Sequence, residues 1–283
     1  MALLAVLAAL LAACGSDSQD KDILTPAAPD LPKAIKDRGV LRIGSDIEYP
    51  PIEFFKEGTN EAQGFDIDVG KALAKELGLE AKFINDTDFA GIIGAMNAGR
   101  FDIIMSAMTD TKERQAGADF LDYFTAGGAM LVEKGNPKGI KTVDDLCGNT
   151  VAVQQGTTYD LELLAPQVEK CSTAGKPLNV LRFEKDADAV QQVKIGRAVA
   201  NLQDYPVAAY TAKTSGDGKD FEVAGEQFGK APYGIAIPKN SPLLQLLQAA
   251  LKKLITNGDY DHILEKWNLR DGALRTASIN GGS

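Results

Sequence analysis

The chain has 283 residues, of which 45% are hydrophobic and 24% are charged, and its formal net charge is −9. This length and composition predict a well-packed globular protein of one or two domains. No segment is rich enough in Lys and Arg to form a nucleic-acid-binding surface, which argues against binding to DNA or RNA. The acidic balance indicates solubility, with a weak preference for cationic ligands.

The N-terminal region has the pattern of an export signal. Residues 2–13 are all Ala, Leu or Val, a run too short to cross a bilayer of about 30 Å, which needs roughly 20 residues. The run has the length of a signal-peptide core, and its last residues, LAAC, resemble the bacterial lipobox, in which the cysteine is acylated. We favour a lipoprotein signal peptide over 1–14, with Cys14 as the lipid attachment site, over a core helix. Residues 15–30 are expected to form a flexible tether.

The two remaining cysteines, Cys147 and Cys171, form an even pair in a protein that is expected to be exported. Export favours a disulfide between them over two unpaired buried thiols. The bridge would close a loop of about 25 residues, which contributes on the order of 3–4 kcal/mol in the chain-entropy model.

Strands and helices alternate after the tether. A buried strand, an amphipathic helix, a strand, a helix and a strand are predicted in that order over 40–45, 66–78, 79–85, 89–99 and 101–106. Gly78 and Gly99 stand where the two helices are expected to end. This β-α-β-α-β order predicts a parallel sheet with right-handed crossovers.

The same rhythm restarts after a Gly/Pro/Lys-rich connector at 134–141. Strands are predicted over 150–155, 178–183, 198–202 and 232–240, and helices from about 158 and over 186–196, 205–212 and 243–267. Two such units predict an α/β fold of two lobes. We expect the first lobe at 31–132 and 238–270, the second lobe at 133–237, crossings near 132–133 and 237–238, and a disordered tail at 271–283.

Polar residues follow the predicted strands, at the sheet edge where ligands bind in such folds. Arg114 could bind a carboxylate with the helix start at Thr157 and Thr158, and Asp204 could bind an ammonium, so this set suits a zwitterion. Taken singly, each residue has an ordinary structural explanation: Thr157, Thr158, Asp66 and Asp204 as N-caps, Arg114 as a surface residue, and Tyr49 and Phe89 as core. The structural explanation weakens because all of them fall on one predicted edge.

Several segments together carry a specific resemblance. The chain between residues 31 and 269 resembles the extracytoplasmic solute-binding proteins of polar amino-acid ABC importers, in the segments IGSDIEYPPIEF, GFDIDVGKALAKELG, FDIIMSAMTDTKERQ, DYFTAGGAMLV, VAVQQGTTYD, LQDYPVAAY and APYGIAIPKNSPLL. The resemblance implies a periplasmic-binding-protein-like fold with two hinge crossings and a ligand cleft between the lobes. It also implies a monomer that is held outside the cell membrane by its lipid and delivers ligand to a membrane permease.

The resemblance assigns roles by position. Arg114 corresponds to the carboxylate-binding arginine and Asp204 to the ammonium-binding aspartate. Thr109, Thr157 and Thr158 correspond to further head-group contacts, Tyr49 and Phe89 to the aromatic pair around the ligand side chain, and Asp46 and Gln154 to side-chain selectors. Ala107 stands where some relatives have serine.

The ligand class follows from charge. Asp46, Glu48 and the net negative charge favour arginine, lysine, histidine or glutamine, and glutamate stays open. The rival hypothesis is a cyclohexadienyl dehydratase-like enzyme, for which Asp46, Glu48 and Asp204 supply acids; a sensor module would be fused to a transmembrane or signalling segment. No cofactor, metal site or catalytic residue is indicated, because the lone histidine, His262, fits a helix face better than a ligand.

Overall fold

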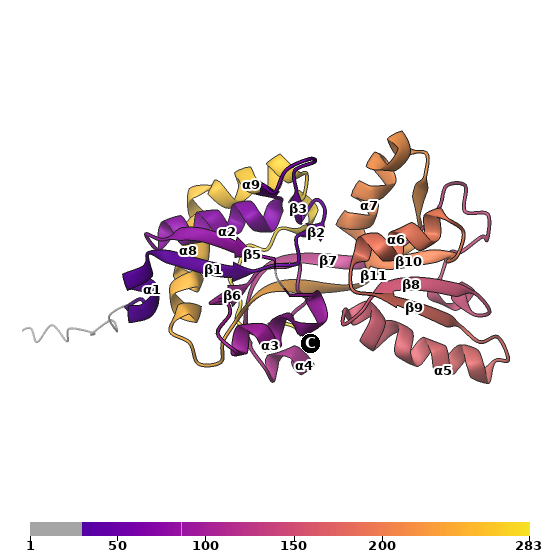
Figure 1. Ribbon diagram of the computed structural model, residues 1–283, viewed down its shortest axis with the longest axis horizontal. Helices are drawn as coiled ribbons and strands as arrows, with labels where there is room; N and C mark the ends of the chain where they lie inside the picture. Colours follow the sequence, from indigo (N-terminus) through magenta and orange to yellow (C-terminus); the bar gives the residue numbers. More distant parts are fainter. Residues whose placement is uncertain (1–29, 86) are drawn as a thin grey trace, which may run out of the picture.

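Two long strands, β7 (Asp119–Glu133) and β11 (Phe221–Ile237), run through both halves of the molecule in the computed structural model (Figure 1). The structure describes residues 30–85 and 87–283. Within them, one eight-stranded sheet has the order β5-β1-β6-β11-β7-β10-β8-β9, and a three-stranded sheet has the order β2-β3-β4. The half that contains β1 to β6 is called lobe 1, and the half that contains β8 to β10 is called lobe 2.

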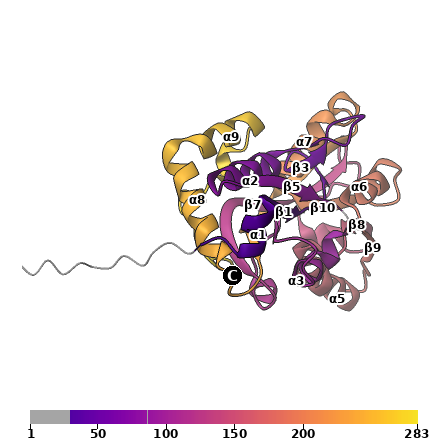
Figure 2. The same ribbon diagram turned by 60° about the vertical axis from the view of Figure 1, so that its left-hand side comes forward.

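Lobe 1 is built on three parallel strands, β1 (Val40–Gly44), β5 (Glu80–Ile84) and β6 (Ile103–Ile104). The small sheet beside them consists of β2 (Glu48–Tyr49), β3 (Glu53–Phe55) and β4 (Ala62–Gln63). The helices of lobe 1 are α1 (Lys33–Arg38), α2 (Phe65–Glu76), η1 (Phe89–Gly91), α3 (Ile92–Asn97), α4 (Lys112–Gln115), α8 (Leu243–Asn257), α9 (Asp259–Trp267) and η5 (Arg270–Gly272). Figures 1 and 2 show α2, α8 and α9 on one side of this lobe and α3 on the other.

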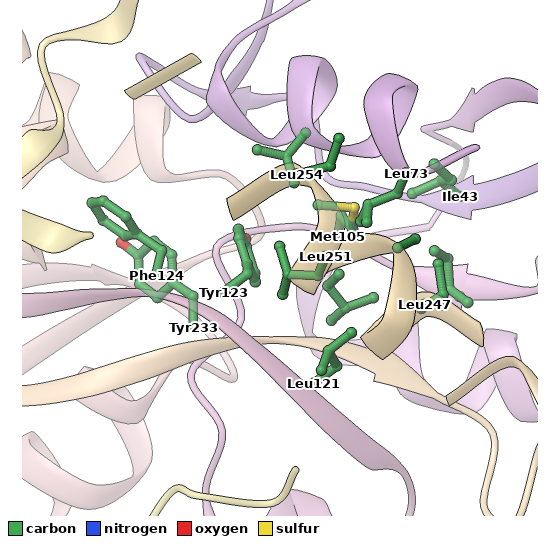
Figure 3. Close-up of a cluster of buried hydrophobic side chains, with 14 of the residues drawn as sticks. Ile43, Leu73, Met105, Leu121, Tyr123, Phe124, Tyr233, Leu247, Leu251 and Leu254 are labelled. Carbon is green, nitrogen blue, oxygen red and sulfur yellow. The ribbon is translucent and has the colours of Figure 1, made fainter. Parts of the chain in front are cut away.

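The amphipathic pattern of α8 explains the larger core of lobe 1. Apolar residues at helical spacing give α8 one buried face, formed by Leu243, Leu247, Ala250, Leu251 and Leu254. Figure 3 shows three of these leucines grouped with Leu73 of α2 and Leu121 of β7. The helix ends at Gly258, whose φ of 90° is the left-handed conformation that favours glycine at a helix C-terminus.

Lobe 2 repeats the parallel arrangement with β8 (Thr150–Gln154), β9 (Asn179–Phe183) and β10 (Ala200–Asp204). Its helical segments are η2 (Val143–Leu146), η3 (Tyr159–Leu164), α5 (Ala165–Thr173), α6 (Asp186–Lys194), α7 (Tyr205–Thr214) and η4 (Ser215–Gly218). The predicted disulfide is present: Cys147 and Cys171 are bonded, with their Cα atoms 5.1 Å apart. It fastens α5 to the end of η2.

The two-lobed α/β fold is as predicted, but the crossings lie earlier than expected. Residues 119–124 of β7 pair with the lobe 1 part of β11, whereas residues 128–131 pair with β10 of lobe 2. The chain therefore passes between the lobes at about 125–127, and it returns at about 228–232, where the β7–β11 register is irregular. The expected positions near 132–133 and 237–238 are the ends of the two long strands instead.

The segment predicted to be a disordered tail has a defined structure. Residues 273 and 279 form antiparallel bridges with Phe124 and Leu121 of β7, and the backbone of 278–280 is hydrogen-bonded to the same strand. The expected disorder is wrong because backbone hydrogen bonds to a strand edge hold this segment in place, and such bonds do not depend on side-chain composition. Cys14 and the tether up to residue 29 lie outside the described residues. Across the residues that are described, no helix has both the length and the apolar character to span a membrane.

Candidate functional site

All ten predicted ligand-binding residues line one cavity between the lobes. Lobe 1 supplies Asp46, Tyr49, Phe89, Ala107, Thr109 and Arg114, and lobe 2 supplies Gln154, Thr157, Thr158 and Asp204. Glu53, Ser106 and Tyr159 complete the lining. The space open to a water-sized molecule is about 20 Å³, close to what one water needs. In this arrangement of the lobes, the cavity is therefore too small for a solute larger than a few water molecules.

Strand ends explain why these residues meet. Asp46 follows β1, Ala107 and Thr109 follow β6, Gln154 ends β8 and Asp204 ends β10. Parallel strands bring their carboxyl ends to one edge of a sheet. The edges of the two lobes face each other, so residues about 150 positions apart come into contact, as when the Tyr49 hydroxyl donates to Asp204 Oδ2 at 3.0 Å.

Arg114 is the one cationic side chain among the residues that line this cavity. Its Nη1 donates to the Thr109 carbonyl at 2.8 Å and its Nη2 donates to the Gly156 carbonyl at 3.0 Å. The guanidinium also lies over the Phe89 ring, with Cζ 5.3 Å from the ring centre, a cation–π arrangement. Burial lowers the pKa of Arg114 from its ordinary value, although it stays a cation.

Asp204 is held by two tyrosine hydroxyls. Tyr159 donates to its Oδ1 at 2.6 Å and Tyr49 donates to its Oδ2 at 3.0 Å, while the Asp204 amide donates to the Tyr49 hydroxyl at 2.8 Å. Burial raises the pKa of Asp204, and the hydrogen bonds from tyrosines oppose that rise. The buried carboxyl group is thus placed to accept further donors such as an ammonium.

Two more carboxyl groups, those of Asp46 and Glu53, line the same cavity as Asp204. Gln154 Nε2 donates to Asp46 Oδ2 at 2.6 Å across the cleft. Ser106 Oγ accepts from the Asp46 amide at 2.9 Å and donates to Glu53 Oε1 at 3.1 Å. Burial raises the pKa of Asp46 to about 6 and raises the pKa of Glu53 well above its usual range. Glu53 Oε2 is buried and has no hydrogen-bond partner among the described residues.

Two of the predicted contacts are already used within the protein. The Ala107 amide donates to Asp66 Oδ2 at 3.0 Å, and the Thr157 hydroxyl donates to the Gln154 carbonyl at 2.8 Å. Asp66 is fully buried and also accepts from Tyr123 at 2.6 Å. It therefore supports the loop at Ala107, a role beyond the ordinary helix-start role that its sequence position suggested.

Sequence reasoning missed Glu53, Ser106 and Tyr159. Glu53 is the one charged residue in the apolar run PPIEFF, and this anomaly is a usable signal. Tyr159 directly follows the predicted Thr157 and Thr158. Ser106 is an ordinary small residue at a strand end, and nothing in its local pattern indicates the relay that it forms between Asp46 and Glu53.

The lobes approach each other closely outside the cavity as well. Lys185 of lobe 2 forms an ion pair with Glu48 of lobe 1. Gly156 has a φ of +77°, and a Cβ atom there would lie 2.8 Å from the Cβ atom of Ala90 in lobe 1.

No group of three or more His, Cys, Asp or Glu side chains suited to a metal ion exists in the described part of the chain. His262 is exposed on α9, remote from the cavity lining.

Comparison with known proteins gives a consistent family. The family model described as bacterial extracellular solute-binding proteins, family 3, matches residues 41–270. The arginine-binding protein ArgT of Corynebacterium glutamicum is 35% identical over 253 residues, which are 88% of this chain and 81% of that protein. The ABC transporter glutamine-binding protein GlnH of Bacillus subtilis is 34% identical over 269 residues, 93% of this chain and 94% of that protein.

Solved structures agree in fold. An ancestral arginine-binding protein bound to arginine superposes with a TM-score of 0.73 at 39% identity, covering 81% of this chain and 98% of that chain. The same kind of ancestral protein bound to glutamine gives a TM-score of 0.73 at 40% identity, with 82% and 99% covered. These similarities extend over both lobes.

Proposed function

This chain belongs to family 3 of the bacterial extracellular solute-binding proteins, and from that premise we propose that it captures an L-amino acid with a cationic side chain, arginine before lysine and histidine. Its relatives are named as binding proteins for arginine, glutamine and cystine rather than as enzymes. The captured amino acid is delivered to the permease of an ABC importer. No turnover of ligand is expected, which disfavours the dehydratase-like alternative.

One observation carries the choice of ligand: the cavity lining contains three carboxyl groups and a single guanidinium. Arg114 matches the α-carboxylate and Asp204 matches the α-ammonium, so the head group uses one charge of each sign. Asp46 and Glu53 are left for the side chain of the ligand. Burial is the main cause of their raised pKa values and disfavours their ionised forms, and a guanidinium or ammonium beside them would favour ionisation.

Neutral and acidic ligands fit this charge balance less well. A glutamine side chain can hydrogen-bond with Asp46 and Gln154 but leaves both carboxyl groups without a cation, and a glutamate side chain adds a third negative charge beside them. Tyr49 and Phe89 offer aromatic faces to the ligand's aliphatic part and, in the case of arginine, to its planar cation. Thr109, Thr157 and Thr158 are proposed as further head-group contacts.

The energies are sufficient for tight capture. Hydrogen bonds that involve a charged group contribute about 1.5–3 kcal/mol each, and a micromolar complex needs about 8 kcal/mol. Three or four such bonds at the head group, with aromatic packing, reach this value. A ligand that touches both lobes favours the closed arrangement, so binding is coupled to hinge closure.

We also propose that the protein is a monomer that is lipid-anchored through Cys14, with residues 15–30 as its tether to the outer face of the cell membrane. The LAAC motif at the end of an apolar run supports this. Incorporation of labelled palmitate by the wild-type chain, and its loss in Cys14→Ser, is the expected result.

Calorimetric titration tests the ligand assignment. The chain from Gly15 onward is unfolded and refolded to remove carried-over ligand, then titrated with arginine, lysine, histidine, glutamine, glutamate and cystine. We expect micromolar or tighter binding of arginine and at least tenfold weaker binding of glutamine. Preference for glutamine or glutamate would overturn the assignment of a cationic ligand, and binding of none of these solutes would overturn the function itself.

A further inference from the structure

The segment that follows α9 is bound along the outer edge of lobe 1. The Asp122 amide donates to the Ser278 carbonyl at 2.9 Å, and the Asn280 amide donates to the Phe120 carbonyl at 2.9 Å. The Phe120 amide in turn donates to Asn280 Oδ1 at 2.8 Å. The family match ends at residue 270, so this segment lies beyond the part of the chain that the family describes.

Two glycines at the end of the segment fit against two buried aspartates. The Gly281 amide donates to Asp122 Oδ2 at 3.2 Å and the Gly282 amide donates to Asp110 Oδ2 at 2.8 Å. Asp110 and Asp122 are 1% and 2% exposed. A Cβ atom on Gly282 would lie 1.9 Å from the Asp110 carbonyl oxygen, and one on Gly281 would lie 2.5 Å from Asp122 Oδ2. Only glycine fits at these two positions without displacing the neighbouring atoms of the aspartates.

Asp110, which accepts from the Gly282 amide, belongs to the loop 109–111 beside Arg114. Asp110 lies between Thr109, whose carbonyl accepts from Arg114, and Thr111, whose hydroxyl accepts from the Arg114 amide at 3.3 Å. Gln115 Nε2 donates to Asp110 Oδ1 at 2.8 Å and to the Gly282 carbonyl at 3.4 Å, which joins α4 to the segment. Figure 1 accordingly marks the C-terminal end beside α4.

We propose that residues 280–282 are a positioning element for the carboxylate-binding side of the site. None of the three lines the cavity, but they hold Asp110 and Gln115 and through them fix the loop 109–111 and the four-residue helix α4. A helix this short has little stability of its own, so the direction of the Arg114 side chain depends on what its turn is fastened to. The expected change in ligand affinity rests on the proposed function, whereas the expected change in the stability of the loop does not.

Gly282→Val tests this by forcing the segment off Asp110. A chain shortened to end at Ile279 is the second variant, because it removes the contact without adding a clash. Gly94→Val is the matched control, since a Cβ atom at Gly94 on α3 of lobe 1 meets no atom of the described residues within 4 Å. Hydrogen exchange of the amides at 115–118 is measured on the free protein, and arginine affinity is measured by calorimetry.

We expect both variants to exchange at 115–118 at least tenfold faster than wild type and the control, while the α8 amides stay unchanged, and to bind arginine about tenfold more weakly. Unchanged exchange at 115–118 would overturn the proposal, as would faster exchange with unchanged arginine affinity. If the wild-type protein binds no arginine, the proposed function fails, and the exchange comparison still decides whether the segment fixes the loop.

Discussion

The guanidinium of Arg114 in lobe 1 donates a 3.0 Å hydrogen bond to the backbone carbonyl of Gly156 in lobe 2. The Thr109 carbonyl accepts a second hydrogen bond, so two of the five guanidinium N–H groups of this cation are paired with neutral acceptors. A carboxylate is a stronger partner for a guanidinium than a carbonyl, because both sides of the bond are charged and the pairing can be bidentate. The same contact also fixes how closely the lobes approach at this point.

Arg114→Lys should weaken arginine binding by at least about a hundredfold. Lysine keeps the charge but loses the planar fork, and the loss of two charge-assisted hydrogen bonds of about 1.5–3 kcal/mol each exceeds the roughly 2.8 kcal/mol that corresponds to a hundredfold change. Calorimetry gives the affinity, and the thermal midpoint of the free protein shows whether the fold is intact. Retention of wild-type affinity would remove Arg114 from the head-group site.

Gly156→Ala should weaken ligand binding by obstructing closure. The new Cβ atom would meet Ala90 of the other lobe at 2.8 Å, in addition to the local cost of a side chain at φ +77°. Gly196→Ala is the matched control, because Gly196 has a φ of +71° and an added Cβ atom meets nothing within 4 Å in the described part of the chain. We expect arginine affinity to fall about tenfold in Gly156→Ala only, with similar losses of thermal stability in both. Equal affinities would show that this contact does not limit closure.

Arginine affinity should rise with pH. Burial raises the pKa of Asp46 to about 6 in the closed cavity, and a cationic side chain favours its ionised form, so below pH 6 a proton must leave on binding. For one such group, affinity should fall about tenfold between pH 7 and pH 5. Asp46→Asn removes this component and should flatten the profile. Titrations in buffers of different ionisation enthalpy should show proton release at pH 6 in the wild type, and its absence would contradict the assignment.

Glu53→Gln should reduce the preference for arginine over glutamine. The Glu53 carboxyl is buried, one of its oxygens has no hydrogen-bond partner among the described residues, and its raised pKa favours the neutral form. A cationic ligand can favour its ionisation, whereas a neutral ligand cannot. We expect the ratio of the two affinities to fall about tenfold, measured by paired titrations. Glu57→Gln, a change on the exposed loop after β3, should leave the ratio unaltered. A loss of both affinities in equal proportion would indicate a structural role only.

Reduction of the disulfide should destabilise the protein without abolishing its ligand preference. Cys147 and Cys171 are 24 positions apart, and closing a loop of that size contributes on the order of 3–4 kcal/mol. The bond lies in lobe 2 away from the cavity lining, so a Cys147→Ser, Cys171→Ser double variant should show a lower denaturation midpoint and nearly unchanged arginine affinity. A large loss of affinity would connect α5 to the site.

The sequence predicts the α/β units well because buried strands and amphipathic helices have clear periodic patterns, as in α2 and β8. The long strand β7 has no such pattern: it is buried almost throughout and contains Gly127 and Gly128, and its length is set by pairing with β11 about 100 residues away. The gathering of ten predicted residues around one cavity follows from the edge of a parallel sheet. The sequence does not predict hydrogen-bond relays such as that from Asp46 through Ser106 to Glu53, because they depend on contacts between residues that are far apart in the chain.

The segment 278–280 also changes how lobe 1 presents itself to other molecules. In lobe 1, β7 is the last strand of the sheet on its side, because β10 pairs only with the lobe 2 part of it. A bare strand of this kind offers a row of unpaired amides and carbonyls on which another chain can add a strand, the usual start of aggregation. The chain covers part of that row with its own backbone. At this part of the edge, the backbone groups of β7 are therefore already hydrogen-bonded when two copies of the protein collide.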